Sequence, residues 1–321
     1  MASAAARFLA SWSTHEVPAR ADYAEVLTTT DRPYVRSAAG VLLGIVMFYF
    51  FANVVTQGLL WLFWTAGDRS TDFAASSRIA LRFENPPGML AAHLGLAMLI
   101  PISMWLVLAI HRSHPKWLAS VLGRLRWDFL GLAAVASLVL FSGALALRQL
   151  GLPTTWQPQP GFIGFLVVIV LTSPLQAAAE EVFFRGYLLQ ALRPLVAPPW
   201  FGVGASALLF ALFHGTQNLP LFLDRFAFGL LAATLVIRTG GLEAAIGAHA
   251  VNNVLAFTTA GLWSTIAQVK AVQQVGWVDM AWDISTYAAF AGVALLMARR
   301  RRLAVVTLES ARGNEPPRGR R

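Results

Sequence analysis

The sequence predicts an all-α fold, a polytopic membrane protein built as a bundle of about eight transmembrane helices. Of its 321 residues, 57% are hydrophobic and 13% are charged, and the mean hydropathy is +0.59, whereas roughly a quarter of the residues in a soluble domain are charged. Long apolar runs alternate with short polar or basic connections, as in helices that cross a bilayer. Cysteine is absent, so disulfides, thiolate metal sites and a cysteine nucleophile are excluded.

Eight apolar stretches are the expected spans. They cover residues 38–66, 88–110, 129–147, 161–192, 200–213, 226–237, 242–259 and 284–297. The fourth is too long for one straight span of about 20 residues, and Pro174 is the expected position of a kink. The expected connections include a polar loop or amphipathic surface segment at 67–87, an uncharged outer linker at 151–160, a boundary at Pro198 and Pro199, and a loop that leads to Asp224 and Arg225.

The distribution of charge predicts the orientation in the membrane. The three most basic connections are residues 111–128, the turn at 238–241 and the tail at 299–321, which holds 8 of the 25 basic residues. Eight spans place all three on one side, which the positive-inside rule assigns to the cytoplasm. The formal charge of +9 therefore indicates topology and contact with anionic membrane lipid, and no nucleic-acid partner is expected.

This topology divides the chain into three parts. We expect a cytoplasmic N-terminal segment at 1–36, a transmembrane helical domain at 37–298 with its catalytic core at 161–260, and a basic cytoplasmic tail at 299–321. The first part contains no apolar h-region, so no cleavable signal peptide is expected. The protein is expected to be integral to a bacterial cytoplasmic membrane, with both termini in the cytoplasm.

The sequence AAAEEVFFRG, residues 177–186, places charged side chains in one of the most apolar parts of the chain. A charged carboxylate at the centre of a membrane helix costs about 3 kcal/mol even on the gentler insertion scales. Glu181 and Arg185 are four residues apart and share a helical face, whereas Glu180 points about 100° away. We therefore expect Arg185 to neutralise Glu181 and Glu180 to remain available for chemistry.

Two further pairs at helical spacing add histidines and an amide. Phe210 and His214 (FALFH) are four residues apart, and so are His249 and Asn253 (HAVNN). These polar groups are unfavourable in lipid unless they meet in a shared cavity. Such a cavity would contain a base, imidazoles and amide donors without a nucleophilic side chain, which suits activation of water and stabilisation of an oxyanion in acyl-bond hydrolysis.

Other interpretations remain for single residues and for the whole set. An isolated His93 or Glu243 is typical of hydrogen bonding between helices, and Arg185 is expected to be structural. The chain has no HExxH motif, no GxSxG elbow, and no serine and histidine arrangement of rhomboid type. Buried carboxylates also relay protons in transporters, but no matching pair of interrupted helices divides this chain into two halves.

The three motifs, in this order and spacing, resemble the CPBP intramembrane proteases, a family related to the type II CAAX prenyl endopeptidases and also called the abortive-infection family. The resemblance covers residues 161–260. Its motifs are EExxxR, FxxxH and HxxxN, formed by Glu180, Glu181, Arg185, Phe210, His214, His249 and Asn253. It implies an eight-helix bundle with a catalytic cavity inside the membrane that opens toward the cytoplasm.

The resemblance also implies roles for these residues. Glu180 and His214 would activate water, His249 with Asn253 would stabilise the oxyanion, and Glu181 and Arg185 complete the candidate catalytic set. The substrate would be a membrane-associated peptide or protein, whose identity, cleavage site and prenylation the sequence leaves open, as it does the oligomeric state. The alternative is a non-catalytic membrane binding protein of the same fold, such as an immunity or assembly factor.

Metal dependence also stays open from the sequence, and no residue is assigned to an organic cofactor. Glu180, His214 and His249 could supply three ligands to a zinc ion, with water in the fourth position. That assignment would use Glu180 both as ligand and as base, and no HxxxH or HExxH pair presents two ligands from one helix. The metal-free mechanism, in which Glu180 takes a proton from water, is therefore favoured.

Overall fold

Helices account for every regular element in the computed structural model, which describes residues 17–28, 32–67, 69–151, 156–196 and 200–308. The all-α prediction is therefore confirmed for these residues. Most of the expected N-terminal segment, the boundary at Pro198 and Pro199, and the tail beyond residue 308 lie outside the described residues.

The helices follow one another with short connections. In chain order they are α2 (Pro33–Ala66), α3 (Phe73–Leu81), α4 (Pro86–Ala97), α5 (Leu99–Ala109), α6 (Trp127–Gln149), α7 (Phe162–Glu181), α8 (Leu189–Leu192), α9 (Phe201–Leu212), α10 (Leu219–Thr239), α11 (Glu243–Trp263), α12 (Ile266–Lys270) and α13 (Trp277–Arg300). A π-helical segment, η3 (Val182–Leu188), joins α7 to α8. Short 3-10 turns are η1 (Tyr23–Glu25), η2 (Pro115–Leu118) and η4 (Arg193–Leu195).

Each of the eight expected spans corresponds to helical structure. Among the described residues, six helical stretches are long and apolar enough to cross a membrane: α2, α4 with α5, α6, α7 through η4, α10 and α13. At 1.5 Å per residue, the 12 residues of α9 are too short for a hydrocarbon core of about 30 Å. The 21 residues of α11 are long enough, but they include Glu243 and His249. The protein is thus a polytopic helical membrane protein.

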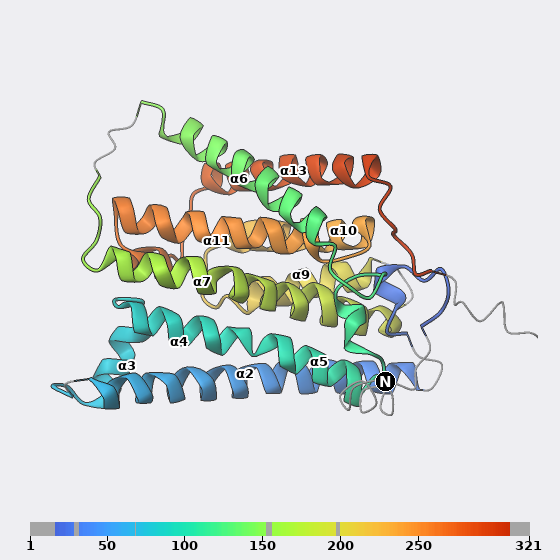
Figure 1. Ribbon diagram of the computed structural model, residues 1–321, viewed down its shortest axis with the longest axis horizontal. Helices are drawn as coiled ribbons and strands as arrows, with labels where there is room; N and C mark the ends of the chain where they lie inside the picture. Colours follow the sequence, from blue (N-terminus) through green and yellow to red (C-terminus); the bar gives the residue numbers. More distant parts are fainter. Residues whose placement is uncertain (1–16, 29–31, 68, 152–155, 197–199, 309–321) are drawn as a thin grey trace, which may run out of the picture.

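Figure 1 shows the helices in roughly parallel rows. α2 packs on α4, α4 packs on α7, and α7 packs on α11. α11 also packs on α6, which crosses the rows obliquely, while α10 packs on both α9 and α13. This order makes α7 and α11 neighbours in the middle of the bundle, and these two helices carry most of the candidate site residues.

The basic connections before α6 and after α10 meet at one end of the bundle. Val121 N–H donates to Gly240 O at 2.9 Å, and Leu242 N–H donates to Ala119 O at 3.0 Å. The expectation that these connections share one side is therefore confirmed. Their assignment to the cytoplasm stays a prediction.

The two ends of the described chain lie at this same end of the bundle. Asp22 forms an antiparallel bridge with Val306. Gly240 ends α10 with a φ of +71°, and a Cβ there would approach Ala304 O to 2.5 Å. The turn therefore requires glycine, both for its left-handed backbone and for the close passage of the segment that follows α13.

The position at which α10 begins differs from the sequence prediction. Asp224 and Arg225 are expected at the end of a loop, but α10 begins at Leu219 and contains both. Asn218 caps the helix by accepting a hydrogen bond from its first turn, and Pro220 follows. Both are signals for a helix start, and they extend the helix beyond its apolar part. The loop prediction was wrong, and the two charged side chains lie on a helix.

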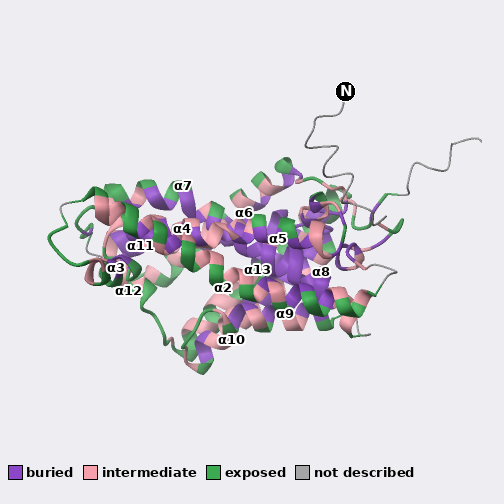
Figure 2. Cartoon of the chain, turned by 90° about the horizontal axis from the view of Figure 1, so that it is seen from below, coloured by how far each residue is buried: buried purple, intermediate pink, exposed green. Residues whose placement is uncertain are grey.

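The helix type of the fourth expected span changes at η3. α7 continues as an α-helix through Pro174, and the geometry changes to a π-helix at Val182. The apolar cluster around η3 buries Phe183, Phe184 and Tyr187. Figure 2 shows many of the buried residues around α5 and α8. π-Helical turns are frequent at functional sites, and this one directly follows the two glutamates.

Candidate functional site

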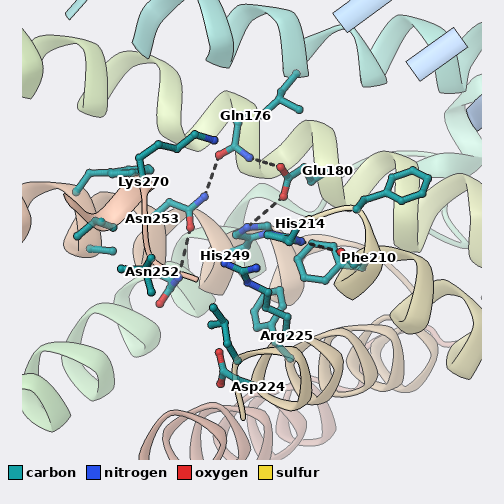
Figure 3. A pocket seen from close by; sticks show the side chains of 18 of the residues that line it. Gln176, Glu180, Phe210, His214, Asp224, Arg225, His249, Asn252, Asn253 and Lys270 are labelled. Atoms are coloured by element: carbon teal, nitrogen blue, oxygen red, sulfur yellow. Dashed lines mark hydrogen bonds and ion pairs between the residues drawn. The ribbon is translucent and has the colours of Figure 1, made fainter. Parts of the chain in front are cut away.

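A series of hydrogen bonds ends at Glu180 (Figure 3). Gln176, one turn earlier on α7, donates from Nε2 to Glu180 Oε1. Gln176 Oε1 in turn accepts from Asn253 Nδ2 at 2.9 Å, which joins α7 to α11. A carboxylate can only accept, so Gln176 must present its NH₂ group to Glu180 and its oxygen to Asn253. The orientation of both amides is therefore set by Glu180.

The series continues to α13. Asn252 Nδ2 donates to Asn253 Oδ1 at 3.3 Å, and Tyr287 Oη donates to Asn252 Oδ1 at 2.8 Å. Three helices thus contribute donors that all point along the series toward Glu180. Asn253 uses only one of its two Nδ2 hydrogens in this series. The second hydrogen is available to a group in the adjoining cavity.

His249 on α11 lies between the two glutamates. Its Nδ1 is 2.7 Å from Glu181 Oε1, and its Nε2 is 3.5 Å from Glu180 Oε2. Because a carboxylate can only accept, Nδ1–H donates to Glu181 and Nε2 faces Glu180. His249 is 5% exposed, so the buried hydrogen bond to Glu181 fixes the orientation of the imidazole ring.

Glu181 and Arg185 form the ion pair that their spacing predicts. Arg185 Nη1 is 2.8 Å from Glu181 Oε1, and both side chains are completely buried. The Arg185 guanidinium also lies over the ring of Phe210, 4.1 Å from the ring centroid, which is a cation–π contact. Neither member of the pair lines the cavity beside Glu180. The pair therefore contacts this cavity indirectly, through His249 and through the ring of Phe210.

His214 follows the end of α9. Its Nδ1 is 2.7 Å from the Phe210 carbonyl oxygen, and since a carbonyl can only accept, Nδ1–H is the donor. In a neutral imidazole, Nε2 is then left as an acceptor. The ring packs edge-on against that of Phe210, with centroids 4.6 Å apart. His214 is accessible and lines the cavity, so its Nε2 can accept a hydrogen bond from water there.

A cavity of about 620 Å³ joins these side chains. Glu180, His214, His249 and Asn253 line it, so four of the six candidate catalytic residues share one space. The volume falls within the range of about 300–1,000 Å³ that is usual for ligand clefts. The connection between α11 and α13 lines it as well, so the cavity also reaches toward the end of the bundle opposite the basic connections. Its opening toward the cytoplasm stays a prediction.

Charged groups outside the three motifs also line the cavity. They are Asp224, Arg225, Lys270 and Asp283. Arg225 donates from Nη1 to Gln217 Oε1 at 2.7 Å. Lys270 lines the cavity, and the residue as a whole is exposed. Desolvation lowers the pKa of Lys270; Glu180 opposes the shift and Arg225 adds to it.

Besides Asp224, Arg225 and Asp283, sequence reasoning missed Gln176, Asn252, Tyr287 and Lys270 as side chains of this site. Gln176 precedes Glu180 by one helical turn and Asn252 adjoins Asn253, so helical spacing was a signal for both. Tyr287 and Lys270 follow α11 in the chain, and no local pattern connects them with the motifs. Only the packing of α12 and α13 against the bundle brings them to the site.

The donor atoms do not form a metal site in the part of the chain that the structure describes. No group of three or more His, Asp or Glu side chains there is arranged to hold a metal ion. Glu180 Oε1 accepts from Gln176, and the Nδ1 atoms of both His214 and His249 are already engaged. These bonds leave Nε2 of both histidines and Oε2 of Glu180 as the remaining donor atoms, but the described side chains are not arranged as a metal site, and no chemical step is assigned to a metal.

The fold and the site define a helical membrane protein with a polar, carboxylate-centred cavity inside its bundle. Residues 160–255 match the family model described as type II CAAX prenyl endopeptidase Rce1-like. All six candidate catalytic residues lie in this stretch. The resemblance to the CPBP proteases that the three motifs indicate is confirmed for these residues.

A curated relative is similar over part of its length. The uncharacterized protein YyaK of Bacillus subtilis (strain 168) is 35% identical over 99 residues, which are 29% of this chain and 33% of that protein. The chain thus spans about a third of the length of this relative. No solved structure matches the chain at a significant level.

Proposed function

We propose that this protein is an intramembrane endopeptidase that hydrolyses a peptide bond of a membrane-associated substrate with water activated by glutamate and histidine. The observation that carries the proposal is the series of hydrogen bonds that runs from Tyr287 on α13 through α11 and Gln176 to Glu180, at the wall of a cavity of about 620 Å³. A hydrogen-bonded carboxylate that faces a cavity is suited to proton transfer. The match of residues 160–255 to an endopeptidase family supports the same reaction class.

The first step forms the bond between water and the substrate carbonyl carbon. Glu180 Oε2, the oxygen that Gln176 leaves free, takes one proton of the water. His214 Nε2 accepts a hydrogen bond from the other O–H and orients the oxygen. A positioned general base of this kind contributes typically about 100- to 10,000-fold to the rate.

The second step breaks the carbon–nitrogen bond. The tetrahedral oxyanion receives hydrogen bonds from the second Nδ2–H of Asn253 and from His249, whose ring is held by the carboxylate of Glu181. When the intermediate collapses, the proton held by Glu180 passes to the leaving nitrogen. The products are a carboxylic acid and an amine, and Glu180 returns to its carboxylate form.

The alternative function is a non-catalytic membrane binding, immunity or assembly factor of the same fold. A comparison of folded variants separates the two functions. Glu180→Gln and His214→Ala should abolish proteolysis and any cellular phenotype that depends on it. Asp128→Asn is the matched control, because this exposed carboxylate lies outside the cavity and contacts Arg301. An unchanged phenotype in both site variants would contradict the proposed enzyme function.

Quantitative proteomics of membranes identifies the substrate class. Cells that produce the parent protein are compared with cells that produce Glu180→Gln at equal level. A membrane-associated precursor should accumulate only with the variant, together with loss of its shortened product. If no precursor accumulates under any growth condition, the proteolytic role is contradicted.

We further infer that both chain ends and the basic connections lie in the cytoplasm, because the basic connections and the two ends of the described chain lie at one end of the bundle, and the positive-inside rule assigns basic connections to the cytoplasm. Reporter fusions at residues 155 and 270 should be external, and those at 118 and 310 should be internal. The reverse result at any two of these positions would overturn the orientation.

A further inference from the structure

A second cavity, of about 190 Å³, is lined by the end of α2, the short helix α3 and the start of α4. Figure 1 shows these three helices together at the end of the bundle opposite the basic connections. α3 packs closely on α4 there, because Gly88 leaves no room for a side chain against the carbonyl group of Ala80. None of the described residues lines both this cavity and the one that contains Glu180. The two cavities are therefore separate sites.

Ser77 of α3 is the observation that points to a ligand. Its side chain is 7% exposed, and its Oγ is buried without a hydrogen-bond partner among the described residues. Ser77 also lines the cavity. A buried hydroxyl without a partner destabilises a fold. A bound group that offers an acceptor atom would remove this cost.

The other polar side chains of the cavity leave donors free. Arg69 donates from Nε and Nη2 to one backbone carbonyl of α2, which leaves Nη1. Asn85 Oδ1 accepts from the Gly88 N–H, and its Nδ2 has no partner among the described residues. The hydroxyls of Thr71 and Ser76 are 2.6 Å apart, so only one of them donates to the other. No carboxylate of the described residues lines this cavity, so the cavity matches a ligand that has acceptor atoms and a negative charge.

The cavity is beside a surface that is typical of a membrane interface. The Arg69 guanidinium lies over the ring of Trp64, 5.5 Å from the ring centroid, and Trp64 Nε1 donates to Thr71 O at 2.9 Å. Trp61 and Leu62, on the same end of α2, are exposed. Tryptophan is enriched at the level of the lipid headgroups, and exposed apolar side chains of a membrane-spanning helix face acyl chains. The polar cavity thus adjoins an apolar surface on α2.

We propose that this cavity binds the phosphate group of a phospholipid whose headgroup carries no positive charge, such as phosphatidylglycerol, with the acyl chains along the end of α2. A phosphate has only acceptor oxygens and a negative charge, which match the arginine and the free donors. A choline or ethanolamine headgroup would instead bring a cation beside Arg69, where no carboxylate lines the cavity. The inference is independent of the proposed function, because it uses no residue of the Glu180 cavity.

The test uses the full-length protein, purified and exchanged into lipid-free detergent. Dioleoyl phosphatidylglycerol, dioleoyl phosphatidylcholine and inorganic phosphate are titrated separately. Native mass spectrometry measures Kd and the number of bound lipids, and thermal unfolding measures the stabilisation. Arg69→Gln removes the charge, and Ser77→Ala removes the buried hydroxyl. Arg78→Gln is the matched control, because Arg78 is exposed on α3 and does not line the cavity.

The parent protein should bind one phosphatidylglycerol in preference to phosphatidylcholine and should unfold at a higher temperature with it. Arg69→Gln should raise the Kd for phosphatidylglycerol by about 10- to 100-fold, the usual size of a lost hydrogen bond to a charged group. Ser77→Ala should raise it by about 3- to 10-fold. Without lipid, Ser77→Ala should be at least as stable as the parent, since it removes a hydroxyl that has no partner. Arg78→Gln should bind the lipid as the parent does.

Four results would overturn the site. Equal binding of the two phospholipids would contradict the headgroup, and equal losses in Arg69→Gln and Arg78→Gln would reduce the effect to attraction by any surface charge. Stabilisation by inorganic phosphate that matches that by phosphatidylglycerol would assign the cavity to a soluble anion. A loss of lipid-free stability in Ser77→Ala would make its hydroxyl structural. No measurement depends on proteolysis, so the failure of either proposal leaves the other unchanged.

Discussion

Two buried pairs of arginine and glutamate lie in different parts of the bundle and differ in how completely they are bonded. At the basic end, Arg126 and Glu243 share two parallel contacts, from Nε to Oε1 at 2.9 Å and from Nη2 to Oε2 at 2.6 Å. The Arg126 N–H also donates to Oε1, and Nη1 donates to Thr239 O. This pair ties the start of α6 to the end of α10 and the start of α11, which confirms Glu243 as a hydrogen-bonding residue between helices.

The pair at the cavity is bonded more sparsely. Arg185 and Glu181 share one contact, and His249 approaches the same Glu181 oxygen. Glu181 Oε2 and the Nε and Nη2 atoms of Arg185 are buried without hydrogen-bond partners among the described residues. The guanidinium instead faces the rings of Phe210 and Phe228 at 4.1 and 5.4 Å.

The comparison distinguishes an ion pair that stabilises the fold from an ion pair that supports the reaction. A fully bonded pair recovers most of its desolvation cost and holds elements in place. An incompletely bonded pair keeps a net cost that the fold must offset elsewhere, which is typical of functional sites. We therefore expect mutations at the two pairs to affect different properties, stability at the basic end and activity at the cavity.

The largest effect is expected at Glu180, the carboxylate that neither arginine neutralises. Glu180→Gln removes the proposed base and keeps the side chain's size, so peptide cleavage should fall by about 100- to 10,000-fold. The thermal unfolding of the purified variant in detergent should match that of the parent. Full activity in the folded variant would contradict the assignment of Glu180 as base.

Removal of Arg126 should produce the larger loss of stability. Arg126→Ala leaves Glu243 as an unpaired buried charge, which costs about 3–5 kcal/mol, and it also removes the donor to Thr239 O. Thermal unfolding in detergent measures the loss. The activity per folded molecule should stay close to that of the parent, because this pair does not line the cavity.

Removal of Arg185 should affect both properties. Arg185→Ala leaves Glu181 with His249 alone, at a cost of about 3 kcal/mol, the lower end of the range for a broken buried pair. Glu181→Ala should likewise lower the folded yield. Unlike Arg126→Ala, both variants should also lose activity per folded molecule, because His249 loses its support. If Arg126 and Arg185 variants have the same profile, the distinction between the two regions fails.

A smaller effect is expected at Tyr287, the far end of the hydrogen-bond series. Tyr287→Phe removes one donor to Asn252 and should cost about 0.5–1.5 kcal/mol, with a fall in kcat of about 10-fold or less. Asn252→Ala should act in the same direction. Kinetics of the two single variants and of the double variant measure the coupling, and fully additive effects would mean that the series does not act as a unit.

The smallest effect is expected from chelation. The described side chains are not arranged as a metal site, so dialysis of the active protein against a chelator should leave the cleavage rate unchanged. Elemental analysis provides the second measurement. Zinc bound near one per chain, with activity lost on its removal and regained on its return, would contradict the metal-free mechanism.

The sequence by itself determined the class of the fold and the local partnerships within helices. Apolar runs of the length of a bilayer became helices, since the backbone must satisfy its own hydrogen bonds in lipid. Spacing of four residues placed Arg185 against Glu181 and His214 beside Phe210. The error at Asp224 arose because a hydropathy pattern marks the apolar part of a helix, whereas the cap at Asn218 sets its start.

Only the tertiary structure decided which side chains complete the site. Gln176 and Asn253 are 77 residues apart and meet because α7 packs on α11, and Tyr287 joins them from α13. Lys270 lines the cavity from the short helix α12, which lies between the seventh and eighth expected spans. Helical periodicity is a local property of the chain, whereas the pairing of helices and their rotation about their own axes are set by how whole faces pack.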